Sequence, residues 1–395
     1  MAIRYLHVIR SLDPARGGPS ESTRQLAAAV RAAGHTVEIA TLDAPSAPWS
    51  AGIACPVHAL GPARGNYGYS PRLRRWLAQH GGRFDAVVVS GLWQYQSLAT
   101  WRALTGGATP YYVFPHGMLD PWFRREYPLK HLKKAVYWRM WESRVLRDAR
   151  AVLFTSEEER RLARTSFTGY AVREHVVHYG TPGPAGGDPA AARARFLTRW
   201  PALRDQRIVL FMGRIHPKKG LDLALEAFAS CAPRQAGLRL VIAGPDEAGM
   251  QLALAERARQ LGVAEAIVWT GMLRGDEKYD ALHAAEVFLL PSHQENFGIA
   301  VAEALSCGVP ALISNQVNIW REVVESQAGL ADDDTLAGTT RLLHSWLALD
   351  APRRSAMRVN ALACFRSHFH IDAAVHSLVE LIGSGRAAAP SPASA

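Results

Sequence analysis

The sequence predicts an α/β protein made of two Rossmann-like, doubly wound domains. Three observations lead to this fold class. Short apolar runs, typical of strands buried on both faces, alternate with helical stretches. The same alternation begins again after residue 200. A glycine- and proline-rich segment, 180–189, separates the two series. At about 150 residues per domain, a chain of 395 residues is long enough for two such domains.

The first half of the chain predicts an N-terminal Rossmann-like domain over residues 1–182. A strand at 5–9 leads into a glycine-containing turn and then a helix over 20–33. Ser20 suits the N-cap of this helix, and Gly34 suits the left-handed position after its end. Further strands are predicted at 37–42, 85–90, 111–114 and 151–154.

The second half predicts a second domain of the same class over residues 200–371. Its strands are predicted at 207–212, 238–243, 266–270, 287–290 and 311–314, and its first helices at 221–230 and 250–261. Residues 183–199 are interpreted as a linker. Residues 384–395 contain little that could pack in a core, so we expect a disordered tail.

Composition leaves several partners open. Lysine and arginine total 45 against 35 acidic residues, which gives a net charge of +10. Nucleic acid, an anionic membrane surface and an anionic small substrate would all suit this charge. The four cysteines are scattered and form no Cys-x-x-Cys pair. This spacing excludes a disulfide framework and a cysteine-based zinc site, and it fits a reducing compartment.

The beginning of the sequence does not resemble a signal peptide. Such a peptide needs about 7–15 uninterrupted apolar residues, whereas Arg4, His7 and Arg10 interrupt the first apolar stretch. No segment approaches the ~18 consecutive apolar residues of a membrane-spanning helix. We therefore expect a cytoplasmic protein that at most lies on a membrane surface.

The most informative segment is 291–310, which follows an apolar strand and opens a helix. A strand, a glycine-containing turn and a helix N-terminus together present free backbone N–H groups to an anion. Glu295 falls in the turn, and Glu303 falls about one turn into the helix. Carboxylates suit sugar hydroxyls because each oxygen accepts two hydrogen bonds. The alternative is that both acids are solvated charges favoured by the helix dipole.

The loop after the strand at 207–212 carries Gly213, Arg214, Lys218 and Lys219. It does not match the Gly-x4-Gly-Lys-Ser/Thr pattern of a Walker A loop. A glycine-containing turn with these cations could neutralise a diphosphate, because arginine offers a planar fork of donors and lysine a point charge. A solvated basic loop is the alternative.

Two segments of the first half are candidates for the same chemistry. Gly17 and Gly18 would let the backbone approach a phosphate at the start of a helix, although an ordinary tight turn is the simpler interpretation. The full Gly-x-Gly-x-x-Gly fingerprint is absent there, which disfavours a dehydrogenase. His116 lies beside Gly117 at the end of a predicted strand and is either functional or a structural hydrogen-bonding residue.

Residues 122–150 combine nine basic residues with three acidic residues, and six aromatic residues are interleaved among them. A basic, aromatic, amphipathic stretch suits an anionic lipid surface. Nucleic acid would also suit it, and a core-packed helix with a solvated basic face is the alternative.

Two further patterns are not expected to bind metal. Asp332, Asp333 and Asp334 contain an Asp-x-Asp pattern, but no apolar strand is predicted before them, so we expect a loop at a helix start. His368 and His370 are two apart in a predicted helix, where they would face different sides.

In their order and separation, these motifs resemble the retaining nucleotide-sugar glycosyltransferases of family 4, which have the two-Rossmann GT-B fold. Residues 213–220 look like the family's Arg…Lys diphosphate loop. Glu295 and Glu303, with seven residues between them, look like its paired glutamates. Residues 241–245 and 269–273 are similar to the strand ends that line its nucleotide pocket. Residues 17–20 and 116–122 look like members that build cell-surface polysaccharides and related glycans.

The resemblance implies a transferase (EC 2.4 type) that moves a sugar from a nucleotide-diphosphate-sugar to a glycan or lipid-linked glycan. It implies that Arg214 and Lys219 hold the diphosphate, Glu303 the ribose, and Glu295 the transferred sugar. The helix over about 372–382 is expected to cross back to the first domain. The implied catalytic residues are His116, Arg214, Lys219 and Glu295. The implied donor-binding residues are Gly18, Gly213, Arg214, Lys219, Gly244, Met272, Glu295, Asn296, Phe297, Gly298 and Glu303.

The same resemblance implies front-face transfer without a metal or other cofactor. Cations and a helix N-terminus would stabilise the diphosphate leaving group, and closure of the two domains would exclude water. A sugar-nucleotide epimerase or a phosphorylase on the same fold is the alternative enzyme. A basic nucleic-acid-binding protein is less favoured, because no recognised nucleic-acid module is visible.

Overall fold

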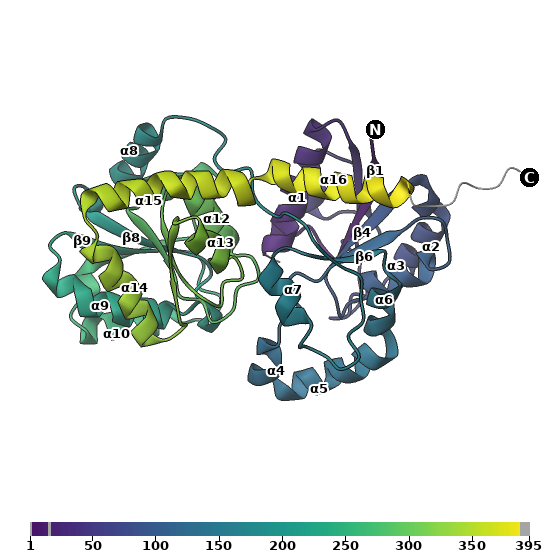
Figure 1. Cartoon of the computed structure of the whole chain (residues 1–395), viewed down its shortest axis with the longest axis horizontal. Coiled ribbons are helices and arrows are strands. Elements are labelled where there is room, and N and C mark those ends of the chain that lie inside the picture. Colours follow the sequence, from purple (N-terminus) through teal and green to yellow (C-terminus); the bar gives the residue numbers. More distant parts are fainter. Residues whose placement is uncertain (1, 15–16, 388–395) are drawn as a thin grey trace, which may run out of the picture. The chain divides into compact units, whose positions relative to one another are not determined.

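The computed structural model describes residues 2–14 and 17–387 (Figure 1). The chain forms two compact units. The N-terminal unit comprises Met1–Gly180 together with the C-terminal segment that begins at Ile371, and the C-terminal unit comprises Thr181–His370. Each unit is built around one parallel β-sheet, as the apolar strands predict.

The N-terminal unit has a seven-stranded sheet of order β3-β2-β1-β4-β5-β6-β7. Its strands are β1 (Arg4–Ile9), β2 (Thr36–Thr41), β3 (Val57–Ala59), β4 (Ala86–Ser90), β5 (Tyr111–Phe114), β6 (Ala151–Phe154) and β7 (Glu174–Val176). β3 and β7, which are the two edge strands, are not predicted from the sequence. Each is three residues long and only partly buried, so neither leaves an apolar run in the sequence.

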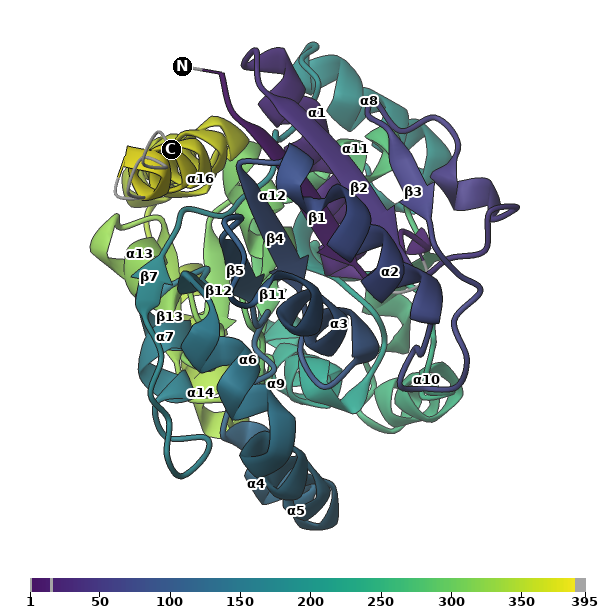
Figure 2. The same ribbon diagram turned by 90° about the vertical axis from the view of Figure 1, so that its right-hand side faces the viewer.

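The helices of this unit cover both faces of its sheet (Figures 1 and 2). Side chains of α2, α3 and α6 share one core with Leu6 and Val8 of β1. Side chains of α1 and α16 share the other core with Tyr5 and Ile9 of the same strand. The helices are α1 (Gly18–Ala32), α2 (Pro71–His80), α3 (Tyr95–Leu104), α4 (Trp122–Glu126), α5 (Pro128–Tyr137), α6 (Ser143–Asp148), α7 (Glu157–Ala163) and α16 (Ile371–Ala387).

Two details of this unit correct the sequence predictions. Gly17, and not Ser20, is the N-cap of α1. Ser20 lies inside the helix and donates a hydrogen bond of 2.9 Å to the backbone oxygen of Ser11. Helix α16 continues to Ala387, so residues 384–387 are helical and not a disordered tail. Residues 388–395 of that predicted tail lie outside the described residues. Gly34 has a positive φ of 83°, as expected at a helix end.

The C-terminal unit has a six-stranded sheet of order β10-β9-β8-β11-β12-β13. Its strands are β8 (Arg207–Met212), β9 (Leu238–Ala243), β10 (Ile267–Gly271), β11 (Val287–Leu290), β12 (Ala311–Ser314) and β13 (Gly329–Asp332). Four of them, β8, β9, β11 and β12, occupy the predicted residues. Because β13 ends at Asp332, the expectation that no strand precedes the aspartate run is wrong.

Helices also cover this second sheet. They are α8 (Pro189–Arg199), α9 (Leu221–Cys231), α10 (Gln251–Gln260), α11 (Asp276–Ala284), α12 (Ile299–Ser306), α13 (Trp320–Glu325), α14 (Leu336–Ala348) and α15 (Ala351–Cys364). Helix α8 corrects the prediction of a linker over 183–199. Asp188 caps it, it packs against α11, and Arg195 forms a 2.5 Å ion pair with Asp280 on that helix. This stretch is therefore part of the C-terminal unit.

Three other expectations can be compared with the structure. The four cysteines are free and buried. His368 lies in a π-helical turn (Phe365–Phe369), and His370 follows in extended backbone. Among residues 2–14 and 17–387, no helix is long and apolar enough to cross a membrane.

A candidate donor site at the carboxyl ends of the strands

The loops that follow β8, β9, β10 and β11 leave the sheet of the C-terminal unit at one edge, because these strands are parallel. Most of the predicted donor-binding residues lie on these loops or close behind them. Gly213, Arg214 and Lys219 follow β8, Gly244 follows β9, and Met272 follows β10. Those that follow β11 are Glu295, Asn296, Phe297, Gly298 and Glu303.

Lys219 and Glu295 form an ion pair between the loops after β8 and β11. Lys219 ends a short turn, and Gly220 follows it in a left-handed conformation with φ of 63°. A Cβ atom on Gly220 would lie 2.1 Å from the backbone oxygen of Pro291, so only glycine lets the two loops pack this closely. This packing brings Lys219, which is predicted to bind the diphosphate, into direct contact with Glu295, which is predicted to bind the transferred sugar.

The backbone around Glu295 is held by the segment that follows β12. The N–H of Glu295 donates to the oxygen of Gln316 at 3.0 Å, and its own oxygen accepts from the N–H of Asn318 at 3.1 Å. Gly298 then caps α12 with φ of 77°. These constraints fix the start of α12, whose cap lies three residues after Glu295 and whose first residue lies four residues after it.

Glu303 lies one helical turn into α12, as predicted, but it is not a solvated charge. Only 6% of the residue is exposed, and its carboxylate accepts a 2.6 Å hydrogen bond from Nζ of Lys278. Lys278 comes from α11 and belongs to no motif found in the sequence. Its position shortly after the end of β10 is the one feature of the sequence that could have pointed to it. The segments at this edge of the sheet thus hold two acid–lysine pairs.

Arg214 is directed to a different partner. Its Nη1 donates to Oε2 of Glu247 at 2.9 Å, and about half of its side chain is exposed. Arg214 therefore lies on the same loop as Lys219 but pairs with Glu247, whereas Lys219 pairs with Glu295.

Glycine at position 244 is required by packing. A Cβ atom there would lie 1.8 Å from the backbone oxygen of Gly213, and the φ of Gly244 is 153°. Met272, at the end of β10, is half exposed. Phe297 is 5% exposed, and its ring meets that of Phe369 edge to face at 5.7 Å, so its side chain is part of the core.

The N-terminal unit gathers a second group of polar side chains at the carboxyl ends of β1, β4 and β5. Nε2 of His116 lies 3.0 Å from Oγ of Ser90, and Nε2 of His7 lies 2.9 Å from the same oxygen. His116 has a positive φ of 49°, which is uncommon for a residue other than glycine. Its ring stacks on Phe114 at 5.3 Å. The sequence pointed to His116 but not to His7 or Ser90.

The hydroxyl of Ser90 has one proton, so it can donate to only one of the two imidazoles. The hydroxyl of Thr23 donates to the backbone oxygen of Pro19 at 2.8 Å and lies 3.5 Å from Nε2 of His7. If Thr23 hydrogen-bonds His7 it can only accept, and the proton then lies on Nε2 of His7. In that arrangement Ser90 accepts from His7 and donates to Nε2 of His116, so a neutral His116 carries its proton on Nδ1.

Burial keeps both imidazoles neutral. It lowers the pKa of His7 to about 3, with the neighbouring His116 as a smaller cause. It lowers the pKa of His116 to about 4. At neutral pH, His116 can therefore donate a hydrogen bond from Nδ1 without carrying a charge.

The turn that carries His116 is held by Glu159, a residue that no sequence motif identified. Oε1 of Glu159 accepts from the N–H of Gly117 at 2.6 Å, and Oε2 accepts from the N–H of Thr155 at 2.8 Å. Glu159 is 4% exposed. One buried carboxylate on α7 thus ties together the chain segments that follow β5 and β6.

Gly18 is the first residue of the 15-residue helix α1. A Cβ atom on it would meet no atom of the described residues within 4 Å. The loop before it is anchored by Asp43, which accepts from Oγ of Ser11 at 2.5 Å and from the N–H of Leu12 at 2.9 Å.

The aspartate run at 332–334 forms ion pairs with neighbouring segments. Asp332 pairs with Arg341 at 2.6 Å and Asp334 with His293 at 2.9 Å. No cluster of three metal-ligating side chains occurs in the described part of the chain.

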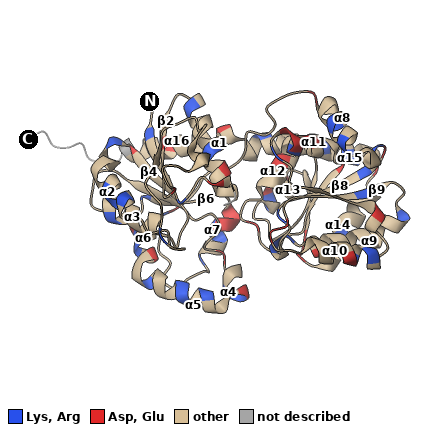
Figure 3. Ribbon diagram, turned by 180° about the vertical axis from the view of Figure 1, so that it is seen from behind, with Lys and Arg blue, Asp and Glu red and all other residues tan. Residues whose placement is uncertain are grey.

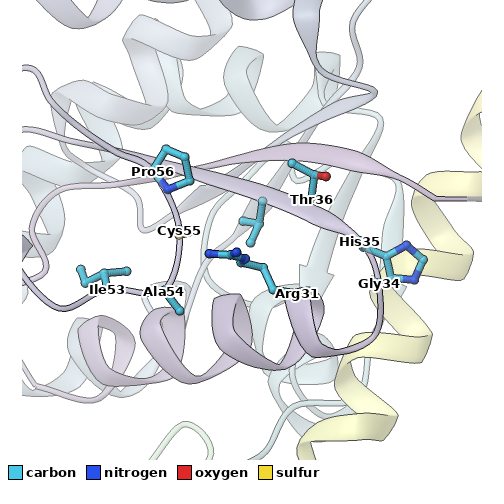
Figure 4. Close-up of a pocket in the computed structure, with 9 residues that line it drawn as sticks. Arg31, Gly34, His35, Thr36, Ile53, Ala54, Cys55 and Pro56 are labelled. Carbon is cyan, nitrogen blue, oxygen red and sulfur yellow. The ribbon is translucent and has the colours of Figure 1, made fainter.

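A cavity of about 590 Å³ in the N-terminal unit is lined by Arg31, His35 and Cys55, among others (Figure 4). It lies where β2 begins, at the opposite end of the strands from His116.

Comparison with known protein families covers both units. Residues 17–180 match the family model described as glycosyl transferase 4-like domain. Residues 196–361 match the model described as glycosyl transferases group 1. The first match covers β2 to β7 of the N-terminal sheet, and the second covers all six strands of the C-terminal sheet.

Curated relatives resemble part of the chain. A D-inositol 3-phosphate glycosyltransferase of Kribbella flavida is 34% identical over 199 residues, which are 48% of this chain and 46% of the relative. The enzyme of the same name from Mycobacteroides abscessus is 30% identical over 198 residues, 48% of this chain and 42% of the relative. The chain thus spans less than half the length of these relatives.

Solved structures share the whole fold. HepE of Anabaena, in complex with UDP and glucose, has a TM-score of 0.75 at 16% identity, covering 97% of this chain and 100% of that one. WaaG, a glycosyltransferase of lipopolysaccharide biosynthesis, has a TM-score of 0.70 at 18% identity, with 96% and 99% covered. Sucrose-phosphate synthase from Thermosynechococcus elongatus has 0.74 at 20% identity, with 98% and 100% covered. These likenesses confirm the predicted GT-B fold.

Proposed function

We propose that this protein is a glycosyltransferase, since its N-terminal unit matches the model for glycosyl transferase 4-like domains and its C-terminal unit matches the model for group 1 glycosyl transferases. The protein transfers a sugar from a nucleotide-diphosphate-sugar to a hydroxyl of a glycan or lipid-linked glycan. The new bond retains the configuration of the donor sugar. An epimerase or a phosphorylase on this fold is not favoured, because the family matches name sugar transfer.

The ion pair between Lys219 and Glu295 is the observation that carries this proposal. A diphosphate that binds here replaces Glu295 as the partner of Lys219. The freed carboxylate of Glu295 then accepts hydrogen bonds from the hydroxyls of the transferred sugar. Glu303, one turn into α12 and already paired with Lys278, accepts from the ribose hydroxyls.

The negative charge that develops on the leaving group is stabilised by cations and backbone dipoles. Lys219, Arg214 and the N–H groups at the start of α12 supply the positive potential, and Arg214 exchanges Glu247 for a phosphate oxygen. Such preorganised electrostatic stabilisation costs no reorganisation during the reaction. In this proposal no resident metal takes part.

The transfer proceeds on one face of the sugar. The bond between the anomeric carbon and the diphosphate oxygen breaks, and a bond from the acceptor oxygen to the same carbon forms on that face. The proton of the acceptor hydroxyl passes to the departing phosphate oxygen. His116 donates from Nδ1 to an oxygen of the sugar, and Gly18 contributes backbone contacts to the phosphates.

A UDP-sugar is the donor class that we propose, because HepE has been solved in complex with UDP-glucose. We further propose that the protein works in the cytoplasm, where its four buried thiols stay reduced. The acceptor class, a glycan or lipid-linked glycan, is the one implied by the sequence resemblance.

Titration calorimetry with UDP, ADP and GDP tests the donor site directly. We expect UDP to bind, and Glu303→Gln to weaken its binding while the thermal midpoint stays within a few degrees. Glu265→Gln, an exposed acid of the same unit, is the matched control and should bind UDP like the parent chain. Unchanged UDP affinity in Glu303→Gln would contradict the ribose role, and absence of binding by all three nucleotides would contradict the proposed function.

A further inference from the structure

Helix α5 presents its aliphatic side chains to solvent. None of its residues is buried. Leu129, Leu132 and Val136 are 78%, 64% and 54% exposed, and Met140 in the following π-helical turn (Trp138–Glu142) is 46% exposed. Their spacing of three and four residues places them on one side of the helix. We call these four residues the α5 stripe.

The opposite side of α5 makes the contacts to the rest of the unit, and it is polar or aromatic. Nζ of Lys134 lies 4.9 Å from the ring centre of Phe123, His131 stacks on Phe167 at 4.7 Å, and the hydroxyl of Tyr137 bonds that of Tyr67 at 2.6 Å. The usual arrangement of a surface helix, apolar side inward, is therefore reversed.

A reversed helix of this kind indicates a partner for its apolar side. Large apolar side chains gathered on one exposed patch mark interaction surfaces in soluble proteins. The unit's own core does not need the α5 stripe, since the inward side of α5 is already packed against aromatic rings.

The charges around the stripe identify the kind of partner. Exposed basic residues border it on α4, α5 and the π-helical turn, and Figure 3 shows such segments in blue along α5. These residues are Arg124, Arg125, Lys130, Lys133 and Arg139. Glu126 is the one exposed acid of 122–140. Glu142 is fully buried.

We infer that the surface formed by the α5 stripe and these basic residues docks onto the surface of an anionic lipid bilayer. Aliphatic side chains would enter the boundary between headgroups and acyl chains, while lysine and arginine meet lipid phosphates. Nucleic acid would match the cations but leave the stripe in water. A second copy of the chain would match the stripe but bring two sets of cations together.

This inference does not depend on the proposed reaction, although it suits an acceptor that is linked to lipid. It also says which part of the protein touches the membrane: the segment from α4 to the π-helical turn of the N-terminal unit. The sequence alone left a core-packed helix with a solvated basic face as an alternative. The exposed stripe contradicts that alternative for α5.

Vesicle flotation with the full chain tests the inference. We expect the protein to float with phosphatidylcholine vesicles that contain about one-third phosphatidylglycerol and not with phosphatidylcholine alone. Two double variants remove one component each: L129S with L132S, and K130Q with K133Q. Each basic residue contributes about fivefold to the partition coefficient, so K130Q with K133Q should lower this coefficient about 30-fold. The first should lower it by at least about tenfold.

Matched controls are available in the C-terminal unit. L252S changes a leucine that is 83% exposed on α10, and R353Q with R366Q removes two exposed charges; both should float like the parent chain. All substituted residues are exposed, and an unchanged thermal midpoint checks the fold of each variant.

Any one of three results would overturn the inference. The protein does not bind the anionic vesicles, the control variants lose as much vesicle binding as the test variants, or the protein binds neutral vesicles equally well. Sedimentation showing a dimer that L129S with L132S dissociates, without vesicle binding, would assign the stripe to a second copy instead. Nucleotide binding measured on the same variants is independent of each of these results.

Discussion

His116 and His7 are joined through a single hydroxyl group, because Oγ of Ser90 lies 3.0 Å from Nε2 of one and 2.9 Å from Nε2 of the other. The proton on Nε2 of His7 therefore decides which nitrogen of His116 is protonated. We therefore propose that His7 influences the proposed reaction as a positioning residue for His116, without touching a substrate itself.

The first prediction concerns this chain of hydrogen bonds. We expect His7→Leu to lower kcat about fivefold, the effect of about 1 kcal/mol from one lost hydrogen bond, and to mix the two tautomers of His116. His7→Gln retains an N–H donor and should restore part of the rate. Nitrogen-15 spectra of the imidazoles report the tautomer directly. A parent spectrum with the proton on Nε2 of His116 would contradict the assignment.

The second prediction concerns stability and pH. The folded pKa values of His7 and His116, about 3 and about 4, lie below the ordinary value of 6.5. The unfolded chain thus binds protons that the folded chain excludes, and the free energy of unfolding falls as pH drops from about 6.5 toward 4. Urea unfolding at several pH values measures this slope. It should be shallower in a variant with both histidines replaced by glutamine, and an equal slope would count against burial as the cause.

The third prediction concerns the ion pair of Lys219 and Glu295. We expect Lys219→Ala to weaken UDP binding about 10- to 100-fold, which is typical of one lost charge-assisted hydrogen bond. Glu295→Ala should strengthen UDP binding, because Lys219 loses the carboxylate that competes with phosphate, while sugar transfer is lost. Calorimetry and a transfer assay separate the two effects. Weaker UDP binding in Glu295→Ala would show that the two groups do not compete.

The fourth prediction concerns Lys278, whose ammonium group bonds the buried carboxylate of Glu303. Removing one partner of a buried pair destabilises a protein by up to 3–5 kcal/mol, and we expect about 1–3 kcal/mol for Lys278→Met because part of this side chain is exposed. Lys278→Met with Glu303→Gln should recover most of the loss. Urea unfolding measures the free energy of unfolding of each variant. A double variant no more stable than Lys278→Met would mean that the Lys278–Glu303 pair is not the source of the lost stability.

The fifth prediction concerns metal ions. We expect sugar transfer to continue in excess EDTA, because the proposed stabilisation of the leaving group uses cations of the chain. If chelation stops the reaction and magnesium or manganese restores it, the aspartates at 332–334 become candidates for a metal site again.

Much of the fold follows from the sequence, because buried parallel strands must be apolar throughout. The bounds of β8, β9, β11 and β12 were predicted to the residue for this reason. The edge strands β3 and β7 are three residues long and face solvent in part, so they leave no such pattern. Helix α8 was hidden behind a glycine-rich run, although Asp188 before Pro189 is a recognisable helix start.

The site was only partly predictable. Lys219, Glu295 and Glu303 could be predicted because they lie near glycine-containing turns at strand ends, and such turns are local sequence patterns. Their partners are not local. Lys278 reaches Glu303 from 25 residues away, and Glu159 reaches Gly117 from 42 residues away. Likewise, the periodicity of α5 shows that it has an apolar side, but only tertiary packing decides that this side faces outward.

Gly244 limits which positions of the proposed donor site can be redesigned. A side chain introduced there would overlap the carbonyl of Gly213 and push two neighbouring loops apart, so this position offers no room for change. Met272, on the adjacent strand end, is half exposed and can be exchanged without disturbing the sheet. Attempts to alter nucleotide preference by directed evolution should therefore randomise Met272 first and leave Gly244 fixed.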